Sequence, residues 1–253
     1  MDIKIPYTPR KHQAYLHRQI DNHRWNVLVC HRRFGKTVCM INHLIRSALL
    51  SKLNNPRFAY IAPTFKQAKS IAWDYMKQFT AKIPHTKFNE TELRVDLPNG
   101  SRITLLGSES PDGLRGIYLD GCVIDEYANV NSKLFPEIIR PALSDRKGYC
   151  VFIGTPMGMN NNFYELYQHA QGAEDWFNYK AKASDTKIVD NDELVKAKEV
   201  MGEKKYLQEF ECDWIANIEG AVYGDVIAKL DDDKQLTRVP YDPALPVSTA
   251  WDL

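Results

Sequence analysis

The sequence predicts an α/β fold in which helices flank a mostly parallel central sheet. An apolar, β-rich run at Trp25–Cys30 leads through a glycine-containing loop into a helical stretch at Lys36–Leu50, and strand, loop, helix is the first unit of an α/β fold. The unit recurs with a strand at Arg57–Ala62 and a helix at about 66–79. Two later apolar runs that end in polar residues extend the same pattern.

Those later segments complete the predicted sheet. Residues 92–97 and 101–106 flank an Asn-Gly pair, which predicts an antiparallel hairpin within the parallel pattern. The apolar runs 122–124 and 149–153 are typical of buried parallel strands. The polar residues that follow them lie where ligands bind in open α/β sheets, so we expect the active face at these strand ends.

The composition bounds the class of protein. With 253 residues, of which 44% are hydrophobic, the chain can bury one good-sized core and a smaller satellite. A formal net charge of +1 means that any nucleic acid must be held by a local basic surface. The five cysteines have no C-x-x-C or zinc-ligand spacing, and no signal peptide or membrane-length apolar run is visible. We therefore expect a soluble intracellular protein with no membrane partner.

One loop carries the pattern of a phosphate-binding site. Residues 30–37, CHRRFGKT, fit the P-loop pattern G-x-x-x-x-G-K-[ST], except that a cysteine replaces the first glycine. Gly35 permits a turn that points amides at phosphates, Lys36 supplies a cation to the β and γ oxygens, and Thr37 offers a hydroxyl to Mg²⁺. A position between strand and helix favours this interpretation over coincidence. The predicted nucleotide-binding residues of the loop are Cys30, His31, Arg32, Arg33, Phe34, Gly35, Lys36 and Thr37.

Two adjacent acids end the apolar run 122–124. Asp125 is expected to bind the nucleotide's Mg²⁺ shell, and Glu126 to polarise the attacking water as a general base. Paired acids after a strand can also simply cap a helix, but a position about ninety residues after Lys36 favours hydrolysis. The sequence therefore predicts an ATPase that uses ATP and Mg²⁺.

Three further residues are candidates on position alone. Thr155, in Gly-Thr-Pro after the run 149–153, is placed to sense the γ-phosphate, or it belongs to a plain turn. Arg115, between two glycines, is either solvated surface or an arginine finger for a neighbouring subunit's ATP. Gln13 lies on a predicted helix ahead of the first strand, where its amide is either exposed or paired with adenine N6 and N7.

Taken together, these motifs resemble the large terminase subunit of tailed bacteriophages, the motor that drives DNA into empty capsids. The resemblance covers nearly all of the chain. It rests on HRRFGKT, YIAPTFKQAKSIAW, the hairpin around LPNGS, DGLRG, VIDEYA, the GTP strand end, and QEFECDW followed by GAVYGDV. Each motif is common alone, and the combination is specific.

The resemblance implies a P-loop NTPase of the additional-strand, catalytic-glutamate class with a small helical lid subdomain. On the family pattern Arg115 acts in trans as the finger, and Arg32 or Arg33 couples nucleotide to lid motion. The implied partners are double-stranded DNA, the portal protein, the small terminase subunit, and further copies of the chain in a ring, usually of five. The implied location is the cytoplasm of the infected bacterial host, with a transient stay on the procapsid portal and absence from the mature virion.

The chain divides into four predicted parts. We expect an ATPase core at 1–160, a helical lid subdomain at 161–235 that can return to the core, a proline-spaced linker at 236–246, and the truncated start of a nuclease domain at 247–253. There Asp252 matches the family's first metal-binding carboxylate. A single carboxylate cannot hold two catalytic metals, so endonuclease activity is expected only of a full-length protein.

Two other functions stay open on the sequence alone. A superfamily 2 helicase-like ATPase shares the glutamine element, P-loop and acidic strand, but needs another full α/β domain. A nucleotide-gated assembly module would bind ATP without hydrolysis, and Glu126 argues against it. Basic residues are candidates for DNA phosphate contacts, although such charges are more often a solvated face; they are Lys66, Lys69, Arg94 and Arg102.

Overall fold

The computed structural model describes residues 5–215, 229–230, 233 and 235. Contacts divide the chain into a unit at Met1–Asn217 and a unit at Ile218–Leu253, and the account below concerns the first. The predicted linker at 236–246 and the segment 247–253, with Asp252, lie outside the described residues.

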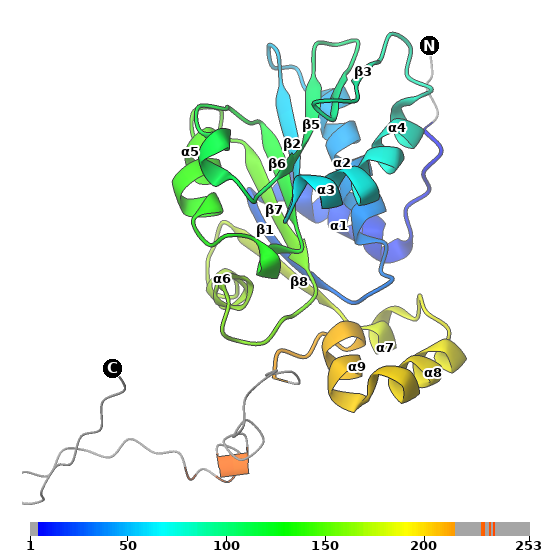
Figure 1. The fold of residues 1–253 in the computed structure, drawn as a ribbon. Coiled ribbons are helices and arrows are strands. Elements are labelled where there is room, and N and C mark those ends of the chain that lie inside the picture. Colours follow the sequence, from blue (N-terminus) through cyan, green and yellow to red (C-terminus); the bar gives the residue numbers. More distant parts are fainter. Residues whose placement is uncertain (1–4, 216–228, 231–232, 234, 236–253) are drawn as a thin grey trace, which may run out of the picture. The chain divides into compact units, whose positions relative to one another are not determined.

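An eight-stranded sheet forms the centre of this unit, with the strands in the order β3-β4-β5-β2-β6-β7-β1-β8 (Figure 1). The pairs from β5 to β8 are parallel, and β3, β4 and β5 pair antiparallel. The strands are β1 Trp25–Cys30, β2 Arg57–Ala62, β3 Lys87–Asn89, β4 Arg94–Asp96, β5 Arg102–Gly107, β6 Gly121–Asp125, β7 Tyr149–Gly154 and β8 Trp176–Ala181. The prediction of a mostly parallel sheet with an antiparallel hairpin, β4 and β5, is confirmed, and β3, which was not predicted, adds a second antiparallel pair.

Helices cover both faces of the sheet and continue beyond it (Figure 1). The α-helices are α1 Lys11–Asn22, α2 Lys36–Leu50, α3 Phe65–Gln67, α4 Asp74–Thr80, α5 Arg140–Ala142, α6 Asn162–Ala170, α7 Ala183–Thr186, α8 Asn191–Met201 and α9 Glu203–Phe210. A π-helical turn, Ala68–Trp73, joins α3 to α4, so the helix predicted at 66–79 is present with a wider central turn. A second π-helical turn, Leu134–Ile139, precedes α5.

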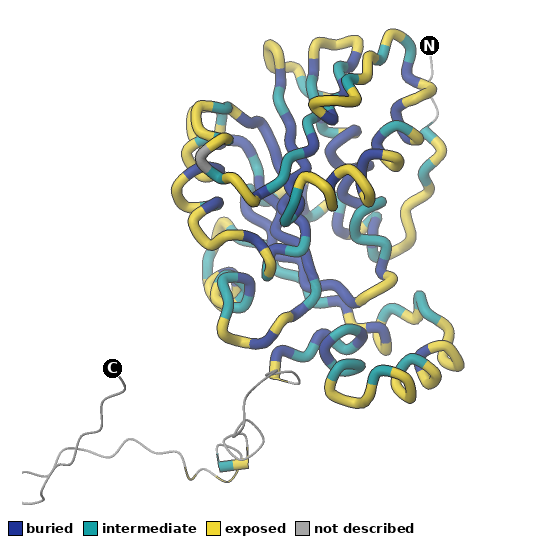
Figure 2. Tube along the Cα trace, viewed as in Figure 1, coloured by how far each residue is buried: buried dark blue, intermediate teal, exposed yellow. Residues whose placement is uncertain are grey.

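Alternate residues of each central strand are buried on opposite faces. In β1, Leu28 packs in the cluster that contains the residues of α2, and its neighbours Val27 and Val29 pack in the cluster on the other face. Figure 2 shows the strands as the most buried part of the trace. Because parallel strands are covered on both sides, they carry the continuous apolar runs that identified them in the sequence.

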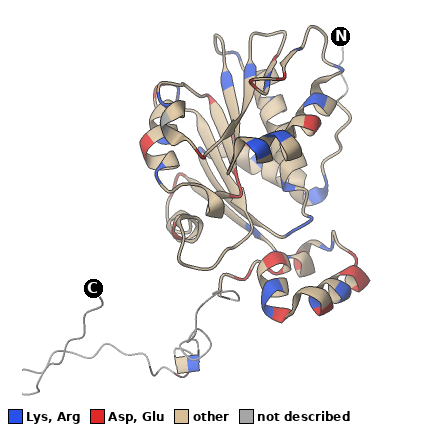
Figure 3. Ribbon diagram, in the orientation of Figure 1, with Lys and Arg blue, Asp and Glu red and all other residues tan. Residues whose placement is uncertain are grey.

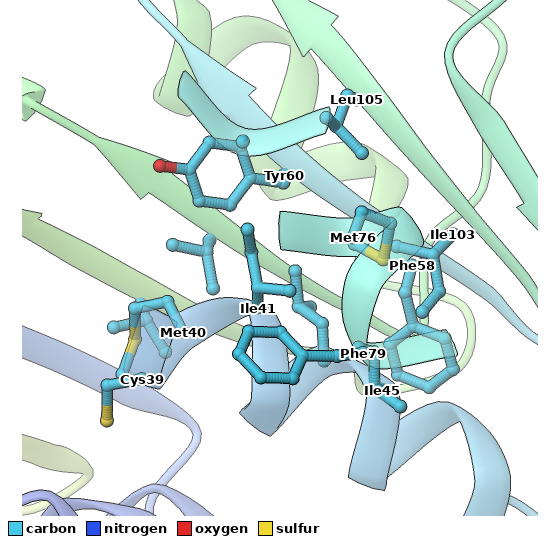
Figure 4. Packing of buried hydrophobic residues seen from close by; sticks show 14 of the residues in the cluster. Cys39, Met40, Ile41, Ile45, Phe58, Tyr60, Met76, Phe79, Ile103 and Leu105 are labelled. Atoms are coloured by element: carbon cyan, nitrogen blue, oxygen red, sulfur yellow. The ribbon is translucent and has the colours of Figure 1, made fainter. Parts of the chain in front are cut away.

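Helices α2 and α4 build the core on one face of the sheet. Figure 4 shows Ile41 and Ile45 of α2 beside Phe79 of α4 and Phe58 of β2, all of them in one buried cluster. This packing holds α2, which begins at the predicted phosphate loop, firmly against the sheet.

The expectation that 161–235 is helical is wrong for β8. This strand lies at the edge of the sheet and pairs in parallel with β1, from Trp25 opposite Trp176 to Cys30 opposite Ala181. Its sequence WFNYKA contains polar residues because an edge strand is only half covered. Phe177 and Tyr179 pack toward α1, and Trp176 packs against Trp25 on the other face. The core therefore continues beyond residue 160.

Helices α7, α8 and α9 form a small cluster of their own around Ala183, Leu194 and Phe210. These helices carry charges of both signs on their outer faces (Figure 3). Within the described ranges, no helix is long and apolar enough to cross a membrane.

Candidate nucleotide site

Three neighbouring strands end beside one another and carry the predicted site residues. The order β6-β7-β1 is parallel throughout, so their carboxyl ends meet at one edge of the sheet. β1 leads into the loop 30–37, β6 ends at Asp125, and β7 ends one residue before Thr155. The topology therefore brings together side chains that are far apart in the sequence.

The loop 30–37 turns at Gly35, which caps the N-terminus of α2. Gly35 has φ 86°, a left-handed conformation that favours glycine. A side chain here would also meet Gln13 Nε2 at 2.9 Å. Arg33 adopts φ 70° and is exposed, whereas Phe34 is fully buried against His31. The loop thus sets its backbone ahead of a helix N-terminus, where amides favour phosphate.

The side chain of Gln13, on α1, forms a hydrogen bond with the backbone of this loop. Its Nε2 donates to the Gly35 carbonyl over 3.3 Å, and its Oε1 accepts from the Arg10 amide over 2.9 Å. Arg10 Nη1 donates to the Phe34 carbonyl. Gln13 is 4% exposed, so in this structure its amide serves the loop backbone instead of an open base pocket.

Lys36 and Glu126 face each other across the strand ends. Lys36 Nζ lies 3.6 Å from Glu126 Oε1 and donates to the Cys30 carbonyl over 3.3 Å. Thr155 Oγ1 donates to Glu126 Oε2 over 3.4 Å. The Glu126 side chain is 40% exposed and that of Lys36 is 12% exposed. The carboxylate is therefore oriented from two sides and still reaches solvent.

Asp125 is buried behind Glu126. Tyr60 donates its hydroxyl proton to Asp125 Oδ2, and the Glu126 amide donates to Oδ1 over 2.9 Å. Burial raises the pKa of Asp125, and the neighbouring Glu126 charge raises it further. Burial and Asp125 likewise raise the pKa of Tyr60, and a side-chain hydrogen bond with Thr37 opposes that shift. Tyr60 thus links the two predicted Mg²⁺ ligands, Asp125 and Thr37.

The donor set around Asp125 fits Mg²⁺. No cluster of three or more acidic, histidine or cysteine side chains among the described residues is arranged to hold a metal. Mg²⁺ does not need one, because it is usually bound through one or two protein oxygens together with phosphates and waters. A cation beside Asp125 would also offset the repulsion between the adjacent carboxylates of Asp125 and Glu126.

A cavity of about 380 Å³ opens at these strand ends. Its lining includes three residues of α9, which sequence analysis did not identify. Their spacing in the sequence, i, i+3 and i+4, places them on one helix face, but no motif marks that face as functional. The lining residues are Arg32, Lys36, Glu126, Asn129, Thr155, Pro156, Met157, Lys205, Gln208 and Glu209.

His31 and Arg32 connect the loop to the helices that follow β8. His31 is fully buried, and burial lowers its pKa. Its Nδ1 donates to the Arg32 carbonyl over 2.6 Å, so the neutral ring's Nε2 accepts from Thr186 Oγ1 over 2.8 Å. The Arg32 amide donates to the Glu209 carbonyl over 2.8 Å. Neither role was apparent from the motif.

Arg115 does not line this cavity. It follows a 3₁₀ turn, Pro111–Leu114, and its guanidinium lies 3.5 Å from Glu137, with both side chains about half exposed. Arg94 and Arg102, two of the DNA candidates, are ion-paired with Asp96. Lys66 and Lys69 are exposed on α3 and on the turn after it.

The fold and the strand-end site define an α/β nucleotide-binding domain of the P-loop kind. The chain belongs to the family described as terminase large subunit, T4likevirus-type, N-terminal, whose model matches residues 29–224. The family expected from the motifs is therefore confirmed.

Curated relatives are the large terminase subunits of Thermus phage G20c and Thermus virus P23-45. Each is 30% identical over 126 residues, an alignment that covers 42% of this chain and 26% of the relative. The chain thus matches about a quarter of the length of these relatives.

Solved structures share the fold. The ATPase domain of the Thermus phage P74-26 large terminase has a TM-score of 0.70 at 22% identity, over 83% of this chain and 95% of that chain. The large terminase of another thermophilic bacteriophage, in complex with ADP, has a TM-score of 0.70 at 16% identity over 81% and 53%. The HK97 large terminase gives 0.68 at 12% identity over 84% and 52%.

Proposed function

We propose that this chain is the ATP-hydrolysing motor domain of a viral DNA-packaging terminase, which couples ATP hydrolysis to movement of double-stranded DNA into a procapsid. The observation that carries the proposal is the cluster of Lys36, Glu126 and Thr155, joined by contacts of 3.6 Å and 3.4 Å beside one cavity. Membership of the terminase family supports the motor role.

In the proposed reaction, the loop 30–37 and Lys36 hold the phosphates of ATP. Lys36 turns from Glu126 toward the β and γ oxygens as they enter, because phosphates offer more negative charge than one carboxylate. Glu126, half exposed and fixed by Thr155, then accepts the proton of the attacking water. Thr37 and Asp125 would hold Mg²⁺, which supplies charge neutralisation at the phosphates.

The partners proposed for the motor follow from the family. They are double-stranded DNA, the portal protein, the small terminase subunit and further copies of the chain in a ring of five, in the cytoplasm of the infected host and transiently on the procapsid portal. Arg115 is proposed to act on a neighbouring subunit's ATP, and Arg33 to assist within its own loop. We further propose that the ATPase core runs to residue 181 and that α7, α8 and α9 form the lid. Endonuclease activity would belong to a full-length protein.

The Glu126→Gln variant tests hydrolysis directly. It keeps the shape of the side chain and removes the base, so we expect turnover of ATP to fall by about 10² to 10⁴-fold. Affinity for ATPγS should stay within a few fold of that of the parent. Glu174→Gln is the matched control, since Glu174 is exposed and lies outside the cavity.

A Glu126→Gln variant that hydrolyses ATP as fast as the parent would remove Glu126 from the mechanism. A parent protein that binds ATPγS but turns over no ATP, alone or with DNA and procapsids, would favour the nucleotide-gated assembly module instead.

A further inference from the structure

One face of α9 forms a wall of the cavity at the strand ends. Lys205, Gln208 and Glu209 line it together with Lys36 and Glu126. Positions i, i+3 and i+4 of a helix share one face, so the three side chains of α9 point into the same space. The motif-bearing loop and strand ends form the opposite wall.

Hydrogen bonds fix α9 to both neighbouring strand ends. Gln208 Nε2 donates to the Pro156 carbonyl over 2.6 Å, directly after Thr155. The Glu209 carbonyl accepts from the Arg32 amide over 2.8 Å. Because these bonds lie one turn after Lys205, they set where the Lys205 side chain can reach.

The Lys205 ammonium is currently held by groups of its own helix. Nζ lies 3.3 Å from Glu209 Oε1 and donates to Gln208 Oε1 over 3.4 Å. Glu209 also lies 3.8 Å from Arg32 Nη1 and is only 14% exposed. One carboxylate, largely buried, thus holds two cations beside the cavity.

We propose that Lys205 is a phosphate ligand. Its ammonium would move away from Glu209 and bind the terminal phosphate of a nucleoside triphosphate. The inference rests on the proposed function of the site. Lys205 lines the same cavity as Glu126 and Thr155, so it lies near the position where water would attack the terminal phosphate. Gln13 and Gly35 do not line this cavity.

The charges of the cavity support a second lysine in this role. Arg32, Lys36 and Lys205 face it with Glu126 and Glu209, a net charge of only +1 against a triphosphate. The lysine ammonium is a compact charge on a flexible stem, suited to a monodentate phosphate contact. Lys205, 41% exposed, has room to reorient.

The test compares ATPγS with ADP, each with Mg²⁺, in equilibrium titrations of the parent and three variants. Lys205→Gln should weaken ATPγS binding about 5- to 15-fold and change ADP binding by less than about twofold, since only the triphosphate presents the terminal group. Lys205→Arg should restore most of the ATPγS affinity. Lys204→Gln is the matched control, because Lys204 precedes Lys205 on α9 and does not line the cavity.

The ratio of the ATPγS affinity to the ADP affinity decides the test. Both ligands bind the same folded protein, so partial unfolding of a variant lowers both affinities equally and leaves their ratio unchanged. An unchanged ratio in Lys205→Gln, whether both affinities fall or neither does, would overturn the assignment of Lys205. A parent protein that binds neither nucleotide would instead overturn the proposed function.

Discussion

Lys36 and Glu126 form an ion pair, with 3.6 Å between Nζ and Oε1, although 90 positions separate them in the sequence. The pair joins the cation proposed to hold phosphate to the carboxylate proposed to activate water. Each charge neutralises the other in this pair, so binding of phosphate to Lys36 would also release Glu126 for its proposed role as a base.

Replacement of Lys36 is expected to weaken the binding of both nucleotides. Lys36→Met would remove the proposed charge-assisted contact to the β-phosphate, which ADP and ATPγS share, so each affinity should fall about 10- to 100-fold. Isothermal titration calorimetry measures both values. Lys52→Met, at an exposed lysine just after α2, should change neither, and parent-like binding by Lys36→Met would argue against the loop 30–37 as the phosphate site.

Replacement of Arg115 is expected to lower hydrolysis in a way that depends on assembly. If Arg115 completes a neighbour's site, the specific activity of the parent rises with protein concentration. The specific activity of Arg115→Ala should then stay low at every protein concentration, about 10³-fold below that of the parent at saturation. The measurement is phosphate release across a concentration series with DNA and procapsids.

The control for this series is Glu137→Gln, which removes the 3.5 Å ion-pair partner of Arg115 and keeps the arginine. It should retain the concentration dependence. A flat dependence in the parent, with Arg115→Ala unimpaired at every concentration, would remove Arg115 from catalysis.

Loss of the Gln208 amide is expected to destabilise the protein. Gln208→Leu leaves the Pro156 carbonyl without its 2.6 Å partner in a buried position, which costs about 1 to 3 kcal/mol. Urea unfolding should show a lower midpoint. Gln168→Leu, at an exposed position of α6, should change the free energy of unfolding by less than about 0.5 kcal/mol. Equal stabilities of the two variants would contradict the anchoring role of Gln208.

The stacked pair of His17, which is half-buried, and His43, which is buried, is expected to make stability depend on pH. The rings stack at 5.3 Å with 3.1 Å between their Nδ1 atoms. Burial, helped by the nearby Arg46, lowers the pKa of His17 to about 4, and burial, His17 and Arg46 lower that of His43 to about 3. The unfolded chain takes up protons below about pH 6.5 while the folded chain does not, so stability falls as the pH drops from about 6.5 toward 4.

Thermal melts at several pH values check this expectation. The loss between pH 6.5 and 4 should be on the order of 2 to 4 kcal/mol. His43→Phe should flatten the slope by removing one titrating ring, whereas His169→Phe, at an exposed position of α6, should keep it. A slope that His43→Phe leaves unchanged would assign the acid sensitivity to other groups.

Much of the fold was predictable because buried parallel strands carry continuous apolar runs. β1 and β2 lie at the predicted residues, and the hairpin at the Asn-Gly pair forms as β4 and β5. β8 was missed because an edge strand needs apolar cover on only part of its surface, so WFNYKA has no run to recognise. The charged helical stretches that follow it, α8 and α9, set a misleading context.

The site was predictable only where a motif fixes backbone geometry. The motifs predicted that Lys36, Asp125 and Glu126 lie at the ends of neighbouring strands, and the structure places them there; their chemical roles stay predictions. The bond from Gln208 to Pro156 and the contacts of Lys205 depend on how α9 packs against two distant loops. No local pattern records that packing. For the same reason the sequence did not reveal the hydrogen bond from the Gln13 amide to the Gly35 carbonyl.

β8 also changes how the phosphate loop withstands force. Because β1 pairs in parallel with β7 on one side and with β8 on the other, a pull along β1 must shear two hydrogen-bond ladders at the same time. Hydrogen bonds loaded in shear must break together and not one after another, so the strand that leads into the loop 30–37 resists extension strongly. In the proposed motor, this pairing on both sides would keep the shape of the loop 30–37 while β1 is under load.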